Sequence, residues 1–526
     1  MKIKRLICFI LSLILTVACF TGCDSNEAYV LYFELDSPPK TLDPQLASGT
    51  SEELLIKNLF EGLVRENDKG EIVGGAAESY SVSDDGLIYT FKLREGAKWS
   101  DGENVTADDF VFALSRAVDP KNKAPYVSSL YGIVGAKSIA TGKKHNGLGV
   151  TKISDNSLKI RLTSPDPKFL HTLTTAICMP CREDIYNKAK GQYGLVADRI
   201  VTNGSFKIRF WEKSDKFSLR INKFADYNGS FTAETSAVIF SAGETTGRAV
   251  RIDEGNLDMG FVNISETSDK SNIFPYETCC YSLIINKNSP LGSRDFRKAF
   301  AKSIHRNRLK NELQKSLNES GCLIPNTVLL NGSALSSKIT ITVPPSYEPN
   351  EAHSLYVTEA EDTKDMPSKI DILYYGNEEI TNMALLVAEN MQQALGAVVN
   401  AIPTDSEEGL FSAVKNGEYT LALVPISAVS SDPEQFFEQF TRSSNNNIFG
   451  FSDDVFDYEV AKIKANASEQ TIIKASETAL KELINDIQII PIAMYSDAFS
   501  YGKDFTCPIF SPFGGVIDLA LVKKVK

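Results

Sequence analysis

Histidine, a common acid–base catalyst and zinc ligand, is sparse in this sequence. Its 526 residues include only four histidines, His145, His171, His305 and His353, which lie far apart and form no H-x-x-x-H pair. Zinc enzymes that use histidine ligands commonly pair them at that spacing. The sequence also contains no G-x-S-x-G, H-E-x-x-H or phosphate-binding glycine loop. These observations argue against an enzyme and predict no cofactor and no metal site.

Two pairs of adjacent aspartates could be taken for an acid and base pair, but their neighbours predict structural roles. Asp84-Asp85 precedes Gly86, a combination that is typical of a tight hairpin turn. Asp108-Asp109 follows Thr106 at the beginning of a helical apolar pattern, where a side-chain carboxylate caps the helix. We interpret both pairs as turn and cap residues.

The cysteines offer two further candidates for chemistry. Cys178-Met-Pro-Cys181 has the spacing of a redox motif, but it lacks the strand-to-helix context of thioredoxin. We therefore favour a structural role for this pair. Cys279 and Cys280 are adjacent in a strand-like run, so their side chains point to opposite faces. Core packing and disulfide pairing both remain open for them.

Local patterns predict the elements that surround these residues. Residues 87–93 alternate between apolar and polar side chains, as a half-buried strand does. Asp85-Gly86 predicts a hairpin that pairs this strand with Tyr80–Val82. Thr106 and Asp109 predict the first turn of the helix that follows. From about residue 282 onward strands and helices alternate, which predicts a sheet covered by helices.

Length and charge limit the function classes. A chain of 526 residues is too long for one core, so two or three domains are expected. The formal net charge is −12, and the first 22 residues contain three basic and no acidic side chains, so their removal makes the charge more negative. Such an acidic protein is a poor partner for nucleic acid.

The N-terminus reads as a targeting segment. Three basic residues precede an apolar run, Leu6–Phe20, that is too short for a comfortable membrane span. The run leads to Gly22-Cys23, which resembles a bacterial lipoprotein box. The resemblance implies a signal peptide over residues 1–22, cleavage before Cys23 and lipid on its sulfur, with the protein anchored outside the cell membrane. The alternative is a signal anchor with an incidental cysteine.

Several short motifs occur in a fixed order along the chain. They are "LDP" near residue 43, "LFEGLV" near 60, "AES", "DG-x-x-Y-x-F-x-LR", "WSDG" and "TA-x-DF" between 77 and 110. Together they resemble the extracytoplasmic solute-binding proteins of peptide-importing ABC transporters, the oligopeptide- and dipeptide-binding lipoproteins of solute-binding family 5. The resemblance implies an α/β, two-lobed periplasmic-binding-protein-like fold (type II, cluster C) with an extra strand-rich subdomain. It also implies that the protein acts as a monomer and works with permease and ATPase subunits of a transporter.

The change of pattern and the resemblance together predict a division of the chain. Lobe I comprises residues 23–60, 191–281 and a C-terminal return over 496–526, with the extra subdomain at 61–190, and lobe II comprises 282–495. Two crossing segments near 275–285 and 490–500 should join the lobes. Thr50 and Glu53 predict a capping box for a short helix that ends near Gly62.

The resemblance places a ligand between the lobes. The expected contacts are Ser48, Gly49, Thr50 and Tyr131 on one side and Pro425, Ile426, Ser427, Ala428, Val429 and Asp432 on the other.

The charged groups with which this family holds peptide ends are replaced in this chain. Family members that bind oligopeptides hold the amino terminus with an aspartate where this chain has Val429, and Ile426 stands at the place of a tryptophan. Arginines that bind the carboxyl end correspond to Val414 and Leu423. The ligand is therefore expected to lack a free amino terminus. Asp432 could act as a substitute clamp, but capping a helix that begins at Pro433 is the favoured interpretation.

Two functions remain open on these grounds. The favoured one is a lipid-anchored binding component of an ABC importer, which captures an extracellular peptide or peptide-like solute. The alternative is a sensor or interaction lipoprotein that keeps the fold without transport and binds a blocked or non-peptide ligand. Growth on a peptide source with and without the gene would separate the two.

Overall fold

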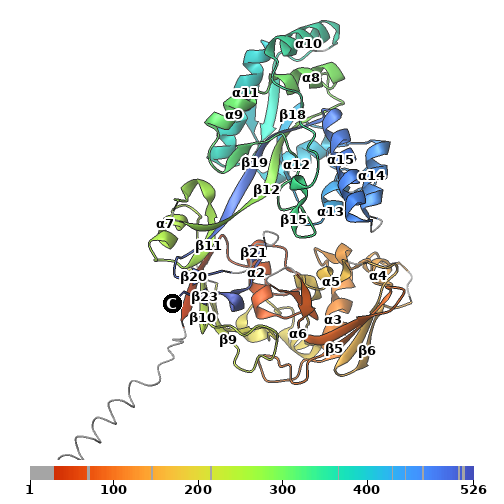
Figure 1. Ribbon diagram of the computed structural model, residues 1–526, viewed down its shortest axis with the longest axis vertical. Helices are drawn as coiled ribbons and strands as arrows, with labels where there is room; N and C mark the ends of the chain where they lie inside the picture. Colours follow the sequence, from red (N-terminus) through yellow and green to blue (C-terminus); the bar gives the residue numbers. More distant parts are fainter. Residues whose placement is uncertain are drawn as a thin grey trace, which may run out of the picture.

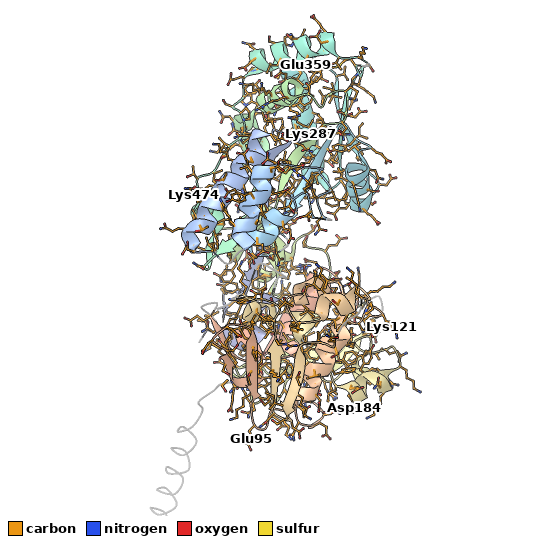
Figure 2. All side chains as sticks on the ribbon, turned by 90° about the vertical axis from the view of Figure 1, so that its right-hand side faces the viewer. Glu95, Lys121, Asp184, Lys287, Glu359 and Lys474 are labelled. Atoms are coloured by element: carbon orange, nitrogen blue, oxygen red, sulfur yellow. The ribbon has the colours of Figure 1, made fainter. Side chains whose placement is uncertain are left out.

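The structure is a computed structural model that describes residues 29–525 except 68–70, 144–145, 167, 214–215, 270, 365, 429, 445, 465–466, 508–509 and 512–515. The predictions for the signal peptide, Cys23 and Val429 lie outside the described residues. Figure 1 shows two lobes stacked along the long axis. In Figure 2, turned by 90°, Glu95, Lys121 and Asp184 lie on one lobe and Lys287, Glu359 and Lys474 on the other. We call residues 29–271 and 502–525 lobe I, and residues 286–488 lobe II.

One sheet runs through both lobes. Its eleven strands lie in the order β17-β16-β18-β12-β19-β11-β1-β10-β9-β8, and β13 pairs with β19. Lobe I contributes β1 (Val30–Leu35), β8 (Phe206–Glu212), β9 (Ser218–Lys223), β10 (Ala237–Ala242) and β11 (Met259–Asn263). Lobe II contributes β13 (Leu317–Glu319), β16 (Ile370–Tyr374), β17 (Val399–Pro403) and β18 (Leu421–Ser427).

Two long strands, β12 (Asn272–Ile285) and β19 (Ile489–Tyr501), connect the lobes as an antiparallel pair. Their register shifts between Glu277 and Cys279 and again between Tyr281 and Ser282. Pro491, which has no N–H for the ladder, lies opposite Ser282 at the second shift. Irregular pairing is therefore concentrated where the strands pass from one lobe to the other.

Helices cover both faces of the sheet in lobe II. They are α8 (Arg294–Ser303), α9 (Arg306–Glu312), α10 (Pro349–Asp362), α11 (Glu378–Leu395), α12 (Glu407–Asn416), α13 (Pro433–Glu438), α14 (Asp454–Lys464) and α15 (Glu469–Asn485). One core cluster packs α12 to α15 against the sheet, and a second cluster packs α8 to α11 against the other face. The prediction of a sheet covered by helices is confirmed.

The strand-rich subdomain of lobe I is a separate antiparallel sheet in the order β4-β5-β7-β6. Its elements are β4 (Ala77–Val82), β5 (Ile88–Leu93), β6 (Val150–Ser154), β7 (Ser157–Arg161) and helix α3 (Ala107–Val118). Gly86 adopts φ +68° in the turn between β4 and β5, so the predicted hairpin is confirmed. The Thr106 N–H donates to Asp109 Oδ2 at 2.8 Å, as the predicted cap requires.

The remaining elements are short. In lobe I they are α2 (Thr50–Leu59), α4 (Ala136–Ala140), α5 (Phe169–Thr172), α6 (Glu183–Ala189), α7 (Arg248–Asp253), β2 (Val64–Glu66), β3 (Ile72–Gly74), β20 (Phe505–Thr506), β21 (Phe510–Ser511), β22 (Val516–Ile517), β23 (Lys523–Lys524) and the 3-10 turns η1 (Val127–Leu130), η2 (Ala176–Cys178), η3 (Ala197–Arg199), η4 (Ile264–Glu266) and η7 (Leu519–Leu521). In lobe II they are β14 (Leu329–Leu330), β15 (Ser333–Ala334) and η5 (Leu335–Ser337). One continuous core runs from Leu31 to Val522 in lobe I and includes the subdomain.

Helix α2 differs from its prediction at both ends. Gly49, not Thr50, is the N-cap, and the helix ends at Leu59. The expected capping box is wrong, because Thr50 lies inside the first turn and the Glu52 carboxylate instead accepts the Lys40 N–H at 2.7 Å. A Cβ at Gly49 would lie 2.2 Å from Glu52 Oε2, so a side chain at the cap would collide with this carboxylate.

A buried arginine connects neighbouring strands of the sheet in lobe I. Arg248 has no exposed side-chain surface, and its guanidinium binds Glu34 Oε1 at 2.9 Å and Asp36 Oδ1 at 2.5 Å. It also donates to the carbonyl oxygens of Leu35, Gly243 and Phe261. These contacts join β1, β11 and the segment after β10 through one side chain.

Candidate functional site

The edge of lobe II that faces lobe I is formed by strand ends and helix beginnings. In β18 the C-terminal residue Ser427 pairs with Cys279, at the end of the lobe II part of β12 that is nearer to lobe I. Strands β16 and β17 run parallel to β18, so their C-terminal ends lie at the same edge. In open α/β sheets ligands bind at the carboxyl ends of the strands. This edge is therefore the candidate site in lobe II.

The predicted contact residues from 425 to 428 differ in how they face this edge. Ile426 is buried in the core that packs α12 to α15 against the sheet, so its side chain is a packing residue. Pro425 and Ala428 are half-buried, and Ser427 is exposed. Of this run, Ser427 therefore has the side chain most available to a ligand.

The two positions that correspond to the family's arginines are interior. Val414 belongs to one core cluster of lobe II and Leu423 to the other, on opposite faces of the sheet. Both side chains are buried among apolar neighbours. An apolar side chain offers no charge to a ligand carboxylate, so neither position can neutralise one.

The predicted contacts of lobe I lie at the beginning of α2 and beside η1. Ser48 and Thr50 are exposed and Gly49 is half-buried. The Tyr126 hydroxyl donates to Ser48 O at 3.2 Å, which fixes the loop before α2. Tyr131 is half-buried, and Lys137 Nζ lies 5.9 Å from the centre of its ring.

Asp432 lies at the N-terminus of α13 and has two roles. Its Oδ1 accepts the Glu434 N–H at 3.0 Å, so the predicted helix cap is confirmed. The same carboxylate binds Lys168 Nζ, which belongs to the subdomain of lobe I. No local sequence pattern predicts this second contact, because Lys168 lies 264 positions away.

The crossing strands carry a partly buried acid close to other acids. Asp497 on β19 lies opposite Tyr276 on β12 and Asn263 on β11. Burial, together with the negative charges of Asp36 and Glu379, raises the pKa of Asp497 to about 6. Glu379 itself bridges the lobes, since it accepts hydrogen bonds from Asn263 at 3.1 Å and from Ser316 at 2.7 Å.

The raised pKa of Asp497 predicts a pH-dependent stability. A carboxyl group whose pKa is higher in the folded protein favours the protonated form, so the free energy of unfolding should fall as the pH rises from about 4 to 6. We expect Asp497→Asn to raise this free energy by about 1–2 kcal/mol at pH 8 and to have little effect at pH 3.5, below the ordinary pKa of the group. Urea denaturation at both pH values measures the difference. An equal effect at both pH values would contradict the assignment.

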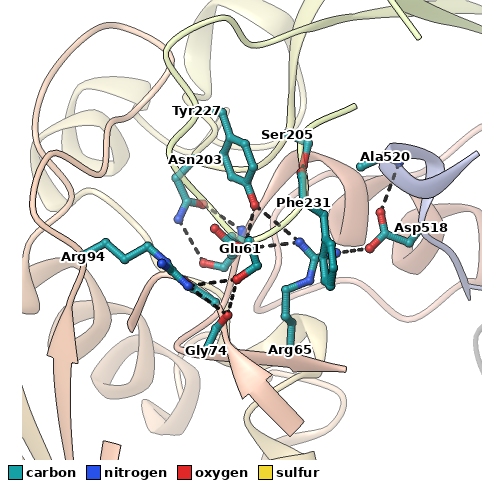
Figure 3. A network of polar contacts seen from close by, with 12 residues as sticks. Glu61, Arg65, Gly74, Arg94, Asn203, Ser205, Tyr227, Phe231, Asp518 and Ala520 are labelled. Atoms are coloured by element: carbon teal, nitrogen blue, oxygen red, sulfur yellow. Dashed lines mark hydrogen bonds and ion pairs between the residues drawn. The ribbon is translucent and has the colours of Figure 1, made fainter. Parts of the chain in front are cut away.

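A second polar network lies inside lobe I, away from the edge of lobe II. Arg65 binds Asp518 and lies 3.3 Å from Glu61 Oε1, and the Tyr227 hydroxyl donates to Glu61 Oε1 at 2.7 Å (Figure 3). Asn203 contacts both the N–H and the carbonyl oxygen of Glu61. The charged residues and the tyrosine of the network line a small cavity together with Lys57, Asn58 and Met179. The sequence signal for this network is the presence of Glu61 within the apolar run 59–64 and of Arg65 directly after it.

The cysteines show no reactive arrangement in the described part of the chain. Burial raises the pKa of the Cys178 thiol to about 12 and that of the Cys181 thiol to about 11, which suppresses the nucleophilic thiolate. Cys279 and Cys280 are buried with free thiols. Among the residues described, no three His, Cys, Asp or Glu side chains are grouped to hold a metal, and no helix is long and apolar enough to cross a membrane.

Comparison with known proteins identifies relatives over nearly the whole chain. The periplasmic oligopeptide-binding protein OppA of Salmonella typhimurium is 27% identical over 476 residues, which cover 88% of this chain and 86% of that protein. The dipeptide-binding protein DppE of Bacillus subtilis is 26% identical over 523 residues, covering 94% and 92%. The crystal structure of Haemophilus influenzae OppA in complex with RPPGFSPFR has a TM-score of 0.74 at 25% identity and covers 95% of this chain and 99% of that chain.

The sequence profile described as "Bacterial extracellular solute-binding proteins, family 5 Middle" matches residues 71–448. This match spans most of both lobes, including the subdomain, the crossing strand β12 and the edge of lobe II. The two-lobed α/β fold with its strand-rich subdomain agrees with it. The chain belongs to family 5 of the bacterial extracellular solute-binding proteins.

Proposed function

We propose that this protein captures a peptide or peptide-like solute between its lobes and delivers it to the permease of an ABC importer. The observation that carries the proposal is the pair of separately packed lobes on two continuous strands, with strand ends and helix beginnings of lobe II directed toward lobe I. Proteins of this build close around their ligand by hinge motion. Transport would need partner permease and ATPase subunits and no cofactor.

The names of the relatives support a peptide as the ligand class, because they include oligopeptide- and dipeptide-binding proteins. Mass spectrometry of small molecules released from the purified protein tests this proposal directly. We expect a peptide or a modified peptide. Growth on peptides as the source of a required amino acid, with and without the gene, tests delivery. Release of a sugar or a metal chelate, with no peptide requirement in growth, would contradict the proposal.

We propose the following division of the chain: lobe I over 23–60, 191–281 and 496–526, its extra subdomain over 61–190, and lobe II over 282–495. The separate core clusters support the separation of lobe I from lobe II, and the separate sheet β4-β5-β7-β6 supports the subdomain. Within the site, Ser48, Gly49, Thr50 and Tyr131 would contact the ligand from lobe I, and Ser427 and Ala428 from lobe II. The protein would act as a monomer, since one chain supplies both sides.

We further propose that Cys23 carries lipid and holds the protein at the outer face of the cell membrane. The Gly22-Cys23 sequence after an apolar run supports this. The Cys23→Ser variant should move from the membrane fraction to the soluble extracytoplasmic fraction. Fractionation after an alkaline wash measures the shift, and a variant that stays bound to the membrane would show that a different anchor acts.

A further inference from the structure

One ion pair spans the two lobes at a distance from the crossing strands. Lys168 Nζ lies 2.5 Å from Asp432 Oδ1 and 2.6 Å from Oδ2, so the ammonium contacts both carboxylate oxygens. Lys168 immediately precedes α5 in the subdomain of lobe I, and Asp432 immediately precedes α13 in lobe II. Figure 1 shows α5 and α13 on the facing edges of the two lobes.

The other polar links between the lobes lie beside the crossing strands. They are the contacts of Asn263 with Glu379, of Ser265 with Ser316 and of Thr267 with Lys315. Within the described residues, Lys168 and Asp432 form the only ion pair between lobe I and lobe II. Polar contacts therefore join the lobes at two places, beside β12 and β19 and at this pair.

The two partners differ in how firmly they are held. The Asp432 side chain is 18% exposed and is fixed by the N–H of Glu434, whereas the Lys168 side chain is 48% exposed on a flexible stem. A primary ammonium on a fixed carboxylate is the arrangement that a ligand with a free amino group would itself seek. Lys168 thus occupies a position that such a ligand could otherwise use.

We propose that Lys168 is a specificity-determining residue, an internal ammonium that occupies the Asp432 carboxylate and so disfavours ligands that bring their own amine there. The inference rests on the proposed function, since it assumes a solute bound between the lobes. A ligand amine must displace Lys168 and separate the lobes at this point, whereas a blocked or uncharged ligand leaves the pair in place. The pair therefore selects solutes without a free amino group at this end of the site.

The test compares two matched peptides, trialanine with a free amino terminus and N-acetyl-trialanine, by calorimetry. The variants are Lys168→Met, which keeps the length of the stem, and Asp432→Asn, which keeps the helix cap because asparagine caps as well as aspartate. Any effect of a substitution that weakens the binding of both peptides equally, such as weaker closure of the lobes, cancels in the ratio of the two affinities. We expect Lys168→Met to shift this ratio about tenfold toward the free peptide. A tenfold shift corresponds to the lower end of the range of free energies for a hydrogen bond to a charged group.

The double variant Lys168→Met/Asp432→Asn should return the ratio to that of the wild type, because no carboxylate remains for the amine. Lys152→Met is the matched control, since Lys152 pairs with Asp108 and Asp155 within lobe I. An unchanged ratio in Lys168→Met, or equal weakening of both peptides, would overturn the proposal.

A second measurement needs no ligand. Small-angle X-ray scattering of the ligand-free protein should show a larger radius of gyration for Lys168→Met than for the wild type, and salt should enlarge the wild type toward the variant. Failure of the wild type to bind either peptide would count against the proposed peptide ligand. In that case an unchanged radius of gyration in Lys168→Met would also overturn the proposed role of the Lys168–Asp432 pair. A larger radius in this variant would support the pair as a contact that holds the lobes together.

Discussion

Replacing Arg248 by alanine should lower the free energy of unfolding by about 3–5 kcal/mol, as expected when one partner of a buried ion pair is removed. The side chain is fully buried, and its loss leaves Glu34 without one of its two arginine partners. It also removes a donor from three carbonyl oxygens, of which that of Leu35 keeps the Gly243 N–H. Urea denaturation followed by tryptophan fluorescence or circular dichroism measures the change.

Arg251 provides the matched control for this prediction. It binds the same Glu34 carboxylate at 2.5 and 2.8 Å, but its side chain is 42% exposed. Arg251→Ala should therefore cost about 1 kcal/mol or less, as exposed pairs do. Equal effects of the two substitutions would mean that burial of Arg248 is not what makes its contacts strong.

Arg65→Ala should be nearly as damaging, at about 3–5 kcal/mol, because it removes the ion-pair partner of the buried carboxylates of Asp518 and Glu61. The loss should be most evident at the C-terminal segment, where Asp518 precedes η7. Hydrogen exchange at Leu519–Leu521 should accelerate more than exchange in α3, because Arg65 joins that segment to the region after α2.

Lys92→Ala is the control for Arg65. Lys92 binds Glu78 at 2.6 Å in the same lobe, but its side chain is 61% exposed. Its removal should change stability by less than about 1 kcal/mol. A small effect for Arg65 together with unchanged exchange at the C-terminal segment would show that η7 is held by its apolar contacts alone.

Local sequence patterns correctly predicted turns and helix caps that depend only on neighbouring residues. The Asp85-Gly86 hairpin, the Thr106–Asp109 cap and the Asp432 cap of α13 each depend on neighbouring residues, and each is confirmed. The same reasoning failed at α2. There Gly49 is the N-cap without a side-chain cap, and the carboxylate of Glu52 accepts the N–H of Lys40 outside the helix.

Contacts between distant segments could not be read from the sequence. Lys168 and Asp432 are 264 positions apart, and Arg65 and Asp518 are 453 apart, so neither pair has a local pattern. Family resemblance predicted the fold class, but it could not indicate that Ile426, Val414 and Leu423 are packing residues. Their burial depends on helices of lobe II that pack against both faces of β18 and its neighbours.

The two continuous strands between the lobes have a mechanical consequence. The two paired strands resist stretching strongly, because each backbone is already close to full extension, but they yield more readily to torsion. Relative movement of the lobes should therefore be a rotation about the ribbon formed by β12 and β19, with the greatest compliance at the register shifts beside Glu277 and Ser282. The ribbon would then act as a torsion spring whose stiffness is set by these two irregularities, so regular pairing there should slow the exchange between lobe orientations.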